Sequence, residues 1–292
     1  MDNEFRSVAA VLDSHRRMEG GGFPVRRPFP TPRVGQIDPF LLLDEMGPVD
    51  WPPNGAIGAP SHPHRGFETV TYVLAGRLEH KDSRGHVAQL EPGDVQWMTA
   101  GRGVLHSEMP APDFYRRGGR MHGFQIWVNL PSSHKMSEPR YQDIRGAEIP
   151  SVDADRVNVR VIAGDSLGAH AIVDTHIPIT FLHVTLQPGG ELVQPLARDR
   201  TALAYVFAGS VRVADATGGE TNVGDGQTAV FEADADRVCL RCAATAQTTA
   251  QLLLLGGEPI GEPVVRYGPF VMNTKQEIMR AIRDYQAGRF FD

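Results

Sequence analysis

ETVTYVLAGRLE, residues 68–79, is the stretch that decides the fold class. Its first part, Glu68 to Leu74, is rich in β-branched and aromatic side chains, which favour strands. Ala75 and Gly76 then mark a turn, because glycine readily adopts the positive φ angles that tight turns require. We therefore expect a strand, a tight turn and a second strand, and we expect such units to build an all-β fold.

The same unit occurs a second time in the chain. LAGRLE at 74–79 is echoed by FAGSVR at 207–212, and LEPGDV at 90–95 is echoed by TNVGDG at 221–226. The two echoes come in the same order and at nearly the same offset, which indicates a duplication. Short strands separated by 31 glycines and 22 prolines are typical of sandwiches and barrels. We predict two β-barrel domains, residues 1–135 and 136–292.

One helix is predicted, and it lies near the end of the chain. Asn273 or Thr274 can cap it, and Glu277 follows Thr274 at the spacing of a capping box. An apolar stripe at helical spacing runs from Ile278 to Tyr285. The barrels are therefore expected to be followed by one short helix.

Two short motifs can bind a metal. They are HPH at 62–64 and HSE at 106–108. Residues two apart on a strand share a face, so each pair directs two donors to one point. An isolated His-x-His pair is more often incidental, but a second pair at the same spacing favours a metal site. Imidazole nitrogens suit iron, zinc, copper and nickel, and the spare coordination positions can bind substrate or dioxygen.

The second repeat serves as an internal control. Its positions equivalent to His62, His64, His106 and Glu108 are Pro195, Ala197, Arg237 and Cys239. None of these keeps the ligand type of the first repeat. We therefore expect the first domain to hold the metal and the second domain to be structural or regulatory.

Glu68 competes with Glu108 for the carboxylate role. It lies four residues after His64 and would share the face of His64 in a regular strand. It could be a ligand, a partner that orients a histidine, or a proton acceptor near the metal. We favour Glu108 as the ligand, and we keep Glu108 and Glu68 as the candidate catalytic residues. Three further histidines, His80, His86 and His134, are expected at the surface.

Composition limits the classes of partner. A net charge of −6 over 292 residues argues against direct binding of nucleic acid, which needs clustered cations. No apolar run approaches the roughly 20 residues that span a bilayer, and the N-terminus lacks the features of a secretory signal. We expect a cytoplasmic monomer without membrane attachment, or a nuclear location in a eukaryote.

Longer motifs around these residues resemble the pirin family, whose members are bicupins of the cupin superfamily. The similar stretches are HPHRGFETVTY at 62–72, GDVQWMTAG at 93–101, HSE at 106–108, GFQIWVNLP at 123–131 and GPFVMNT at 268–274. The resemblance implies two cupin barrels of the jelly-roll, double-stranded β-helix type. It also implies one metal on His62, His64, His106 and Glu108, with iron(II) expected and zinc, manganese, nickel, cobalt or copper as alternatives.

The resemblance implies two kinds of function. Some pirins are similar in activity to quercetin 2,3-dioxygenase, which opens the ring of a flavonol with dioxygen, so a small aromatic substrate is expected. Other pirins act as partners of transcription factors or metabolic enzymes, so the alternative is a redox-sensing, iron-binding regulator with a protein partner. The sequence favours the enzyme slightly, and the ligand set serves both functions.

Overall fold

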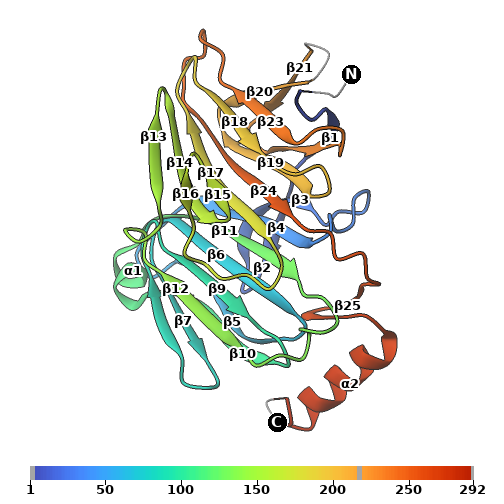
Figure 1. Ribbon diagram of the computed structural model, residues 1–292. Coiled ribbons are helices and arrows are strands. Elements are labelled where there is room, and N and C mark those ends of the chain that lie inside the picture. Colours follow the sequence, from blue (N-terminus) through green and yellow to red (C-terminus); the bar gives the residue numbers. More distant parts are fainter. Residues whose placement is uncertain (1–3, 216–218, 291–292) are drawn as a thin grey trace. The chain divides into compact units, whose positions relative to one another are not determined.

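The computed structural model describes residues 4–215 and 219–290, and almost all its regular structure is β-strand (Figure 1). The chain divides into two compact units. Among the described residues, the first barrel comprises 16–148 and 260–290, and the second barrel comprises 4–15, 149–215 and 219–259. The predicted boundary after residue 135 thus differs from the structure, in which the division follows Glu148 and each barrel also includes one end of the chain.

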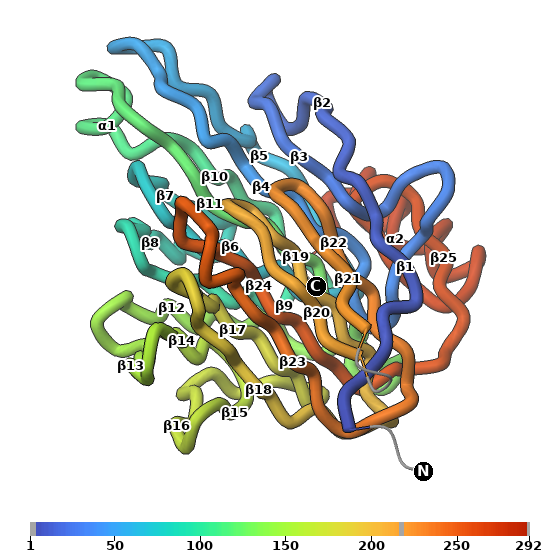
Figure 2. The backbone as a smooth tube through the Cα atoms, turned by 90° about the horizontal axis from the view of Figure 1, so that it is seen from above, coloured from blue at the N-terminus to red at the C-terminus, as the bar shows by residue number. Residues whose placement is uncertain are grey.

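The first barrel is built from two sheets of antiparallel strands. Its elements are β2 (His15–Glu19), β3 (Phe23–Phe29), β4 (Phe40–Trp51), β5 (Ala59–His64), β6 (Phe67–Ala75), β7 (Leu78–Asp82), β8 (Val87–Leu90), β9 (Val95–Thr99), β10 (Val104–Pro110), α1 (Pro112–Arg117), β11 (Gly119–Asn129), β12 (Arg140–Ile144), β25 (Val265–Tyr267), β26 (Phe270–Met272) and α2 (Lys275–Gln286). The larger sheet has the order β12-β9-β6-β11-β4-β3-β2, and the smaller has the order β5-β10-β7-β8. Figure 2 shows β3 and β4 side by side, as their pairing requires.

The second barrel repeats this arrangement. Its elements are β1 (Val8–Asp13), β13 (Ser151–Ala154), β14 (Val157–Ala163), β15 (Asp165–Ser166), β16 (Ala169–His170), β17 (Ile179–Leu186), β18 (Glu191–Pro195), β19 (Thr201–Ala208), β20 (Ser210–Ala214), β21 (Glu220–Gly224), β22 (Gln227–Phe231), β23 (Arg237–Arg241) and β24 (Ala250–Gly257). The larger sheet has the order β1-β22-β19-β24-β17-β14-β13, and the smaller has the order β18-β23-β20-β21. The predicted duplication of an all-β barrel is therefore confirmed.

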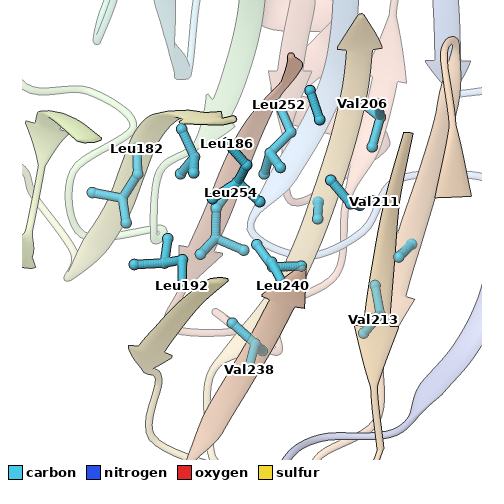
Figure 3. Close-up of a cluster of buried hydrophobic side chains, with 14 of the residues drawn as sticks. Leu182, Leu186, Leu192, Val206, Val211, Val213, Val238, Leu240, Leu252 and Leu254 are labelled. Carbon is cyan, nitrogen blue, oxygen red and sulfur yellow. The ribbon is translucent and has the colours of Figure 1, made fainter. Parts of the chain in front are cut away.

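The interior of the second barrel is filled with aliphatic side chains (Figure 3). Leu182, Leu192, Val206, Leu240 and Leu254 belong to this cluster, and each of them is at least 98% buried. A core packed in this way is stabilised by apolar burial. The second barrel thus has an aliphatic interior where its strands meet.

The C-terminal helix α2 begins as the sequence predicts. The Thr274 hydroxyl accepts a hydrogen bond from the backbone N–H of Glu277, and the Glu277 carboxylate accepts one from the backbone N–H of Thr274. This capping box satisfies two N–H groups that the first turn leaves unpaired. Ile278 and Ala281 are buried against Phe270 and Met272 of β26, so the helix packs on the hairpin that precedes it. No helix in residues 4–215 and 219–290 has the length and apolar character needed to cross a bilayer.

Candidate metal centre

The three predicted histidine ligands lie together on two neighbouring strands of the smaller sheet. His62 and His64 are on β5, His106 is on β10, and His62 pairs directly with His106 across the two strands. The ring centroids are 4.7 Å apart for His62 and His64, 4.4 Å for His62 and His106, and 4.8 Å for His64 and His106. One potential ligand atom from each residue lies within 4.8 Å of the others, so the three can share one ion.

The ring nitrogens of this cluster are arranged as metal ligands require. His62 Nδ1 donates to the Pro60 carbonyl at 2.7 Å, so His62 Nε2 keeps its lone pair and lies 3.1 Å from His64 Nε2. His106 Nε2 is buried and has no hydrogen-bond partner in the part of the chain that the structure describes. Converging lone pairs and a buried nitrogen without a partner fit a transition-metal ion at this point.

The protonation state of the cluster also fits metal binding. Burial, reinforced by the neighbouring imidazoles, holds the pKa values of His64 and His106 well below the ordinary histidine value. A buried imidazole without a carboxylate partner loses more hydration energy as a cation than as a neutral ring. Both rings are therefore neutral near pH 7, and the neutral imidazole is the form that binds a metal.

His80 stands directly behind His106, and its predicted surface position is wrong. It lies on β7, is 1% exposed, and its Nε2 is 3.1 Å from His106 Nδ1. The signal that could have placed it is the alternation along β7, because His80 lies two residues after the buried Leu78. The other two histidines expected at the surface, His86 and His134, are half-buried.

A chain of hydrogen bonds continues from His80 to a carboxylate. His80 Nδ1 donates to Gln96 Oε1, and Gln96 Nε2 donates to Asp143 Oδ1 at 2.8 Å. With a metal on His106 Nε2, His106 Nδ1 must carry the proton and donate to His80, so every bond in the chain has one donor and one acceptor. Such outer partners fix the tautomer and orientation of a ligating imidazole.

Glu108 lies beside the histidine cluster but is not part of it. A bulge between His106 and Glu108 changes the register of β10 with β5, and Glu108 lines the same cavity as His62 and His64. The Thr71 hydroxyl donates to Glu108 Oε1 at 2.7 Å. In this structure Glu108 is therefore held by Thr71, and its role as fourth ligand stays a prediction.

Glu68 lies on the face of β6 opposite to Thr71, which faces the cavity residue Glu108. The expectation that Glu68 shares the face of His64 therefore does not hold. The strand is interrupted between them, because Gly66 has φ +89° and ends β5 before β6 begins at Phe67. Glu68 Oε1 accepts a hydrogen bond from the Thr99 hydroxyl at 2.6 Å, whereas Thr71 faces Glu108. This geometry favours Glu108 as the carboxylate of the site, and it gives Glu68 no place in the cavity lining.

The cluster opens into a cavity of about 490 Å³. Its walls are mostly apolar and include Leu42, Val73, Leu78, Met121 and Trp127. The Trp127 ring lies 5.2 Å from the His64 ring and forms the wall next to it. A cavity of this size, apolar with a few polar groups, is typical of sites for small organic ligands.

Residues after Ile260 return to the first barrel and complete this cavity. Arg65, which directly follows His64, donates to the carboxylate of Asp284 at 2.8 Å and to the carbonyl of Phe290 at 3.3 Å. Its guanidinium also lies 4.4 Å from the centre of the Phe290 ring. Pro269 accepts a hydrogen bond from the Arg65 backbone N–H and lines the cavity.

Lys135 and Gly66 also hold the C-terminal segment, through close contacts with Val271. Lys135 is 1% exposed, and its ammonium group donates to Gly66 O at 2.8 Å, Asn129 Oδ1 at 2.7 Å and Val271 O at 3.1 Å. A Cβ atom on Gly66 would lie 2.0 Å from Val271 O, so only glycine permits this approach. The sequence analysis did not single out either residue, because their partners are distant in the chain.

Comparison with known proteins agrees with the geometry. The pirin family model matches residues 22–128, and the model of the pirin C-terminal cupin domain matches residues 181–291. The chain belongs to the pirin family. Its two barrels are accordingly cupin domains, as the resemblance implied.

Individual members of the pirin family match over nearly the whole chain. A pirin-like protein of Solanum lycopersicum is 43% identical over 290 residues, which cover 97% of this chain and 92% of that protein. A crystal structure of quercetin 2,3-dioxygenase from Acinetobacter baumannii has a TM-score of 0.90 and 38% identity and covers 98% of each chain. The bacterial pirin YhhW of Escherichia coli, crystallised with nickel(II), shares the fold with a TM-score of 0.63 at 21% identity, over 86% of this chain and 98% of that one.

Proposed function

We propose that this protein is a dioxygenase of the quercetin 2,3-dioxygenase type, which opens a flavonol ring with dioxygen and releases carbon monoxide at one mononuclear metal. The observation that carries the proposal is the group of three imidazoles, two of them held neutral by burial, beside an apolar cavity of about 490 Å³. The similarity to the quercetin 2,3-dioxygenase structure of Acinetobacter baumannii supports the same activity.

The residues of the site have distinct proposed roles. His62, His64 and His106 hold the metal, for which we propose iron(II), and Glu108 is the proposed fourth ligand. The bound metal would supply open coordination positions that activate a flavonol hydroxyl and dioxygen. Nickel, zinc, manganese, cobalt and copper would suit the same donors, and nickel(II) is the ion bound by YhhW.

Glu108 is also the proposed proton acceptor. The Thr71 hydroxyl occupies Glu108 Oε1, which leaves Oε2 to accept the proton of the substrate hydroxyl. Trp127 and the aliphatic walls exclude water from the reacting ring. Glu68, on the other face of β6, has no part in this proposal.

Oxygen uptake with flavonols as substrates tests the proposal. Iron-loaded wild-type protein is compared with His62→Ala and with His170→Ala, a matched control that changes an exposed histidine in the second barrel. We expect metal-dependent uptake and carbon monoxide release by the wild type and the control, and loss of both in His62→Ala. The dioxygenase proposal is refuted if the protein turns over no flavonol. If it then also binds a protein partner in a way that depends on the metal's oxidation state, the regulatory alternative is supported.

A further inference from the structure

Five charged side chains line the cavity in addition to Glu108, and four of them pair with each other. Arg27 Nε donates to Asp44 Oδ1 at 2.6 Å, and a second nitrogen of Arg27 lies 3.0 Å from Glu19 Oε1. Arg17 Nε lies 2.7 Å from the same Glu19 oxygen. Arg17, Arg27, Glu19 and Asp44 therefore balance one another, with two positive and two negative charges.

Arg266 is the fifth charged residue, and no carboxylate pairs with it in residues 4–215 and 219–290. Its Nε donates a long hydrogen bond of 3.4 Å to the Gly268 carbonyl. Arg266 is an exposed residue, and its guanidinium is partly desolvated where it packs on Trp127. This partial desolvation and the nearby Arg27 lower the pKa of Arg266, while Glu19 and Asp44 act in the opposite direction. The cavity lining thus has three arginines and three carboxylates, Glu19, Asp44 and Glu108, and among the described residues Arg266 is the arginine of the lining that no carboxylate contacts.

Trp127 places this guanidinium on the wall next to the metal site. The Arg266 guanidinium lies 4.4 Å from the centre of the Trp127 ring, and Trp127 lies 5.2 Å from the ring of His64. A guanidinium that contacts an aromatic ring in this way is held by a cation–π attraction. Its outer N–H groups can then donate two parallel hydrogen bonds to a carboxylate or another oxyanion.

We propose that Arg266 is a specificity residue that selects planar aromatic anions as ligands of this cavity. The anionic group is a carboxylate or an ionised hydroxyl, bound by the guanidinium edge, while the ring lies against the apolar wall. The inference deepens the proposed function, on which it rests, because it names the ionised form of an aromatic compound as the substrate class. A divalent metal ion on the three histidines would add positive charge to the site, because the carboxylate of Glu108 would offset only one of the ion's two charges.

Equilibrium binding to the full-length, metal-loaded protein tests this proposal without any turnover. The probes are two matched pairs, 2-naphthoate with 2-naphthamide and 4-nitrophenolate with 4-nitroanisole, so that carboxylate and ionised hydroxyl are tested separately. The variants are Arg266→Gln, Arg266→Lys and a control, Arg116→Gln, which changes an exposed arginine outside the cavity.

The wild type is expected to bind at least one anion about fivefold more tightly than its neutral partner. The expected difference is modest because water partly screens a charge-assisted hydrogen bond at this site. Arg266→Gln should abolish the preference and leave the affinity for the neutral probe within about twofold. Arg266→Lys should keep part of the preference, because it keeps the charge but loses the planar pair of donors. Arg116→Gln should match the wild type.

Three results would overturn the inference. They are equal binding of both members of each pair by the wild type, an undiminished preference in Arg266→Gln, and no binding of any probe at millimolar concentration. Failure of the dioxygenase proposal is distinguishable from these. A protein that turns over no flavonol but shows the Arg266-dependent preference refutes the enzyme and supports the anion-selective cavity.

Discussion

Replacing His80 by leucine is expected to weaken metal binding roughly 10- to 100-fold while the three ligand histidines stay in place. His80 is the only side chain in the described part of the chain that hydrogen-bonds to the buried Nδ1 of His106. Leucine has a similar volume but can neither accept that proton nor donate to Gln96. The imidazole of His106 then loses the partner that fixes its tautomer and orientation.

The expected loss of metal affinity follows from the burial of two hydrogen bonds, His106 to His80 and His80 to Gln96. His80, His106 and Gln96 are 1%, 2% and 2% exposed, so water cannot replace the lost partner. Each buried polar group left unpaired costs about 1–3 kcal/mol, and the expected loss of metal affinity corresponds to about 1.4–2.8 kcal/mol. His80→Gln should retain most of the wild-type affinity, because its side-chain amide can accept from His106 and donate to Gln96.

A competition titration against a metal-chelating dye measures this affinity directly. Thermal unfolding of the metal-free variants shows whether the barrel remains folded, and the spectrum of the copper(II)-loaded protein reports the ligand geometry. His170→Leu, in the second barrel, is the matched control. The reasoning is refuted when His80→Leu binds the metal as tightly as the wild type under conditions in which His106→Ala binds none.

Three other substitutions test the segment that completes the cavity. Gly66→Ala should lower the free energy of unfolding by roughly 3 kcal/mol or more, because the new Cβ would lie 2.0 Å from Val271 O and φ at this position is +89°. Urea unfolding measures this change, and an unchanged midpoint would contradict the prediction. Burial lowers the pKa of Lys135 in the folded protein from 10.5 to about 8. The unfolded chain therefore binds this proton more tightly than the folded protein, so the charged form of Lys135 favours folding less than the neutral form does. The wild type should therefore gain stability relative to Lys135→Met as the pH rises from 8 to 10.5, by up to roughly 3 kcal/mol, and a pH-independent difference between the two would exclude this. Thr274→Ala should remove the capping box and destabilise α2 by about 1 kcal/mol, seen as faster amide exchange confined to the helix, whereas exchange at the wild-type rate would show that the cap contributes little.

The repeated strand and turn units were sufficient to predict the duplicated barrel, and the HPH and HSE motifs predicted that His62, His64 and His106 lie together. The counting that equated His62 with Pro195 and His106 with Arg237 agrees with the strand register. His62 pairs with His106 in the first barrel, and Pro195 pairs with Arg237 in the second. The prediction of the barrels rests on turn patterns that both repeats keep, and the prediction of the site rests on two motifs that only the first repeat keeps. The capping box at Thr274 was predictable because it too is a short local motif.

The errors concern residues whose position depends on a break in the strand or on distant partners. Glu68 was assigned to the inward face because alternation was continued through Gly66, where the backbone turns. His80 was assigned to the surface because the alternation along β7 was not applied to it, and its bond to His106 joins two strands that are distant in sequence. The assignment of the N-terminal strand β1 to the second barrel was not predicted, because it depends on the pairing of β1 with β22, which no local pattern in either strand indicates.

The return of the C-terminal segment to the first barrel has a consequence for how the protein matures. A ribosome has released His62, His64 and His106 long before it reaches Arg266 and Pro269, so a nascent chain presents the imidazoles in an unfinished, solvent-open pocket. The segment that packs on Arg65 and Lys135 is synthesised after all three histidines, because it follows them in the chain. A chain truncated before Pro269 would lack Pro269, which lines the cavity, and we expect its three imidazoles to be more open to solvent.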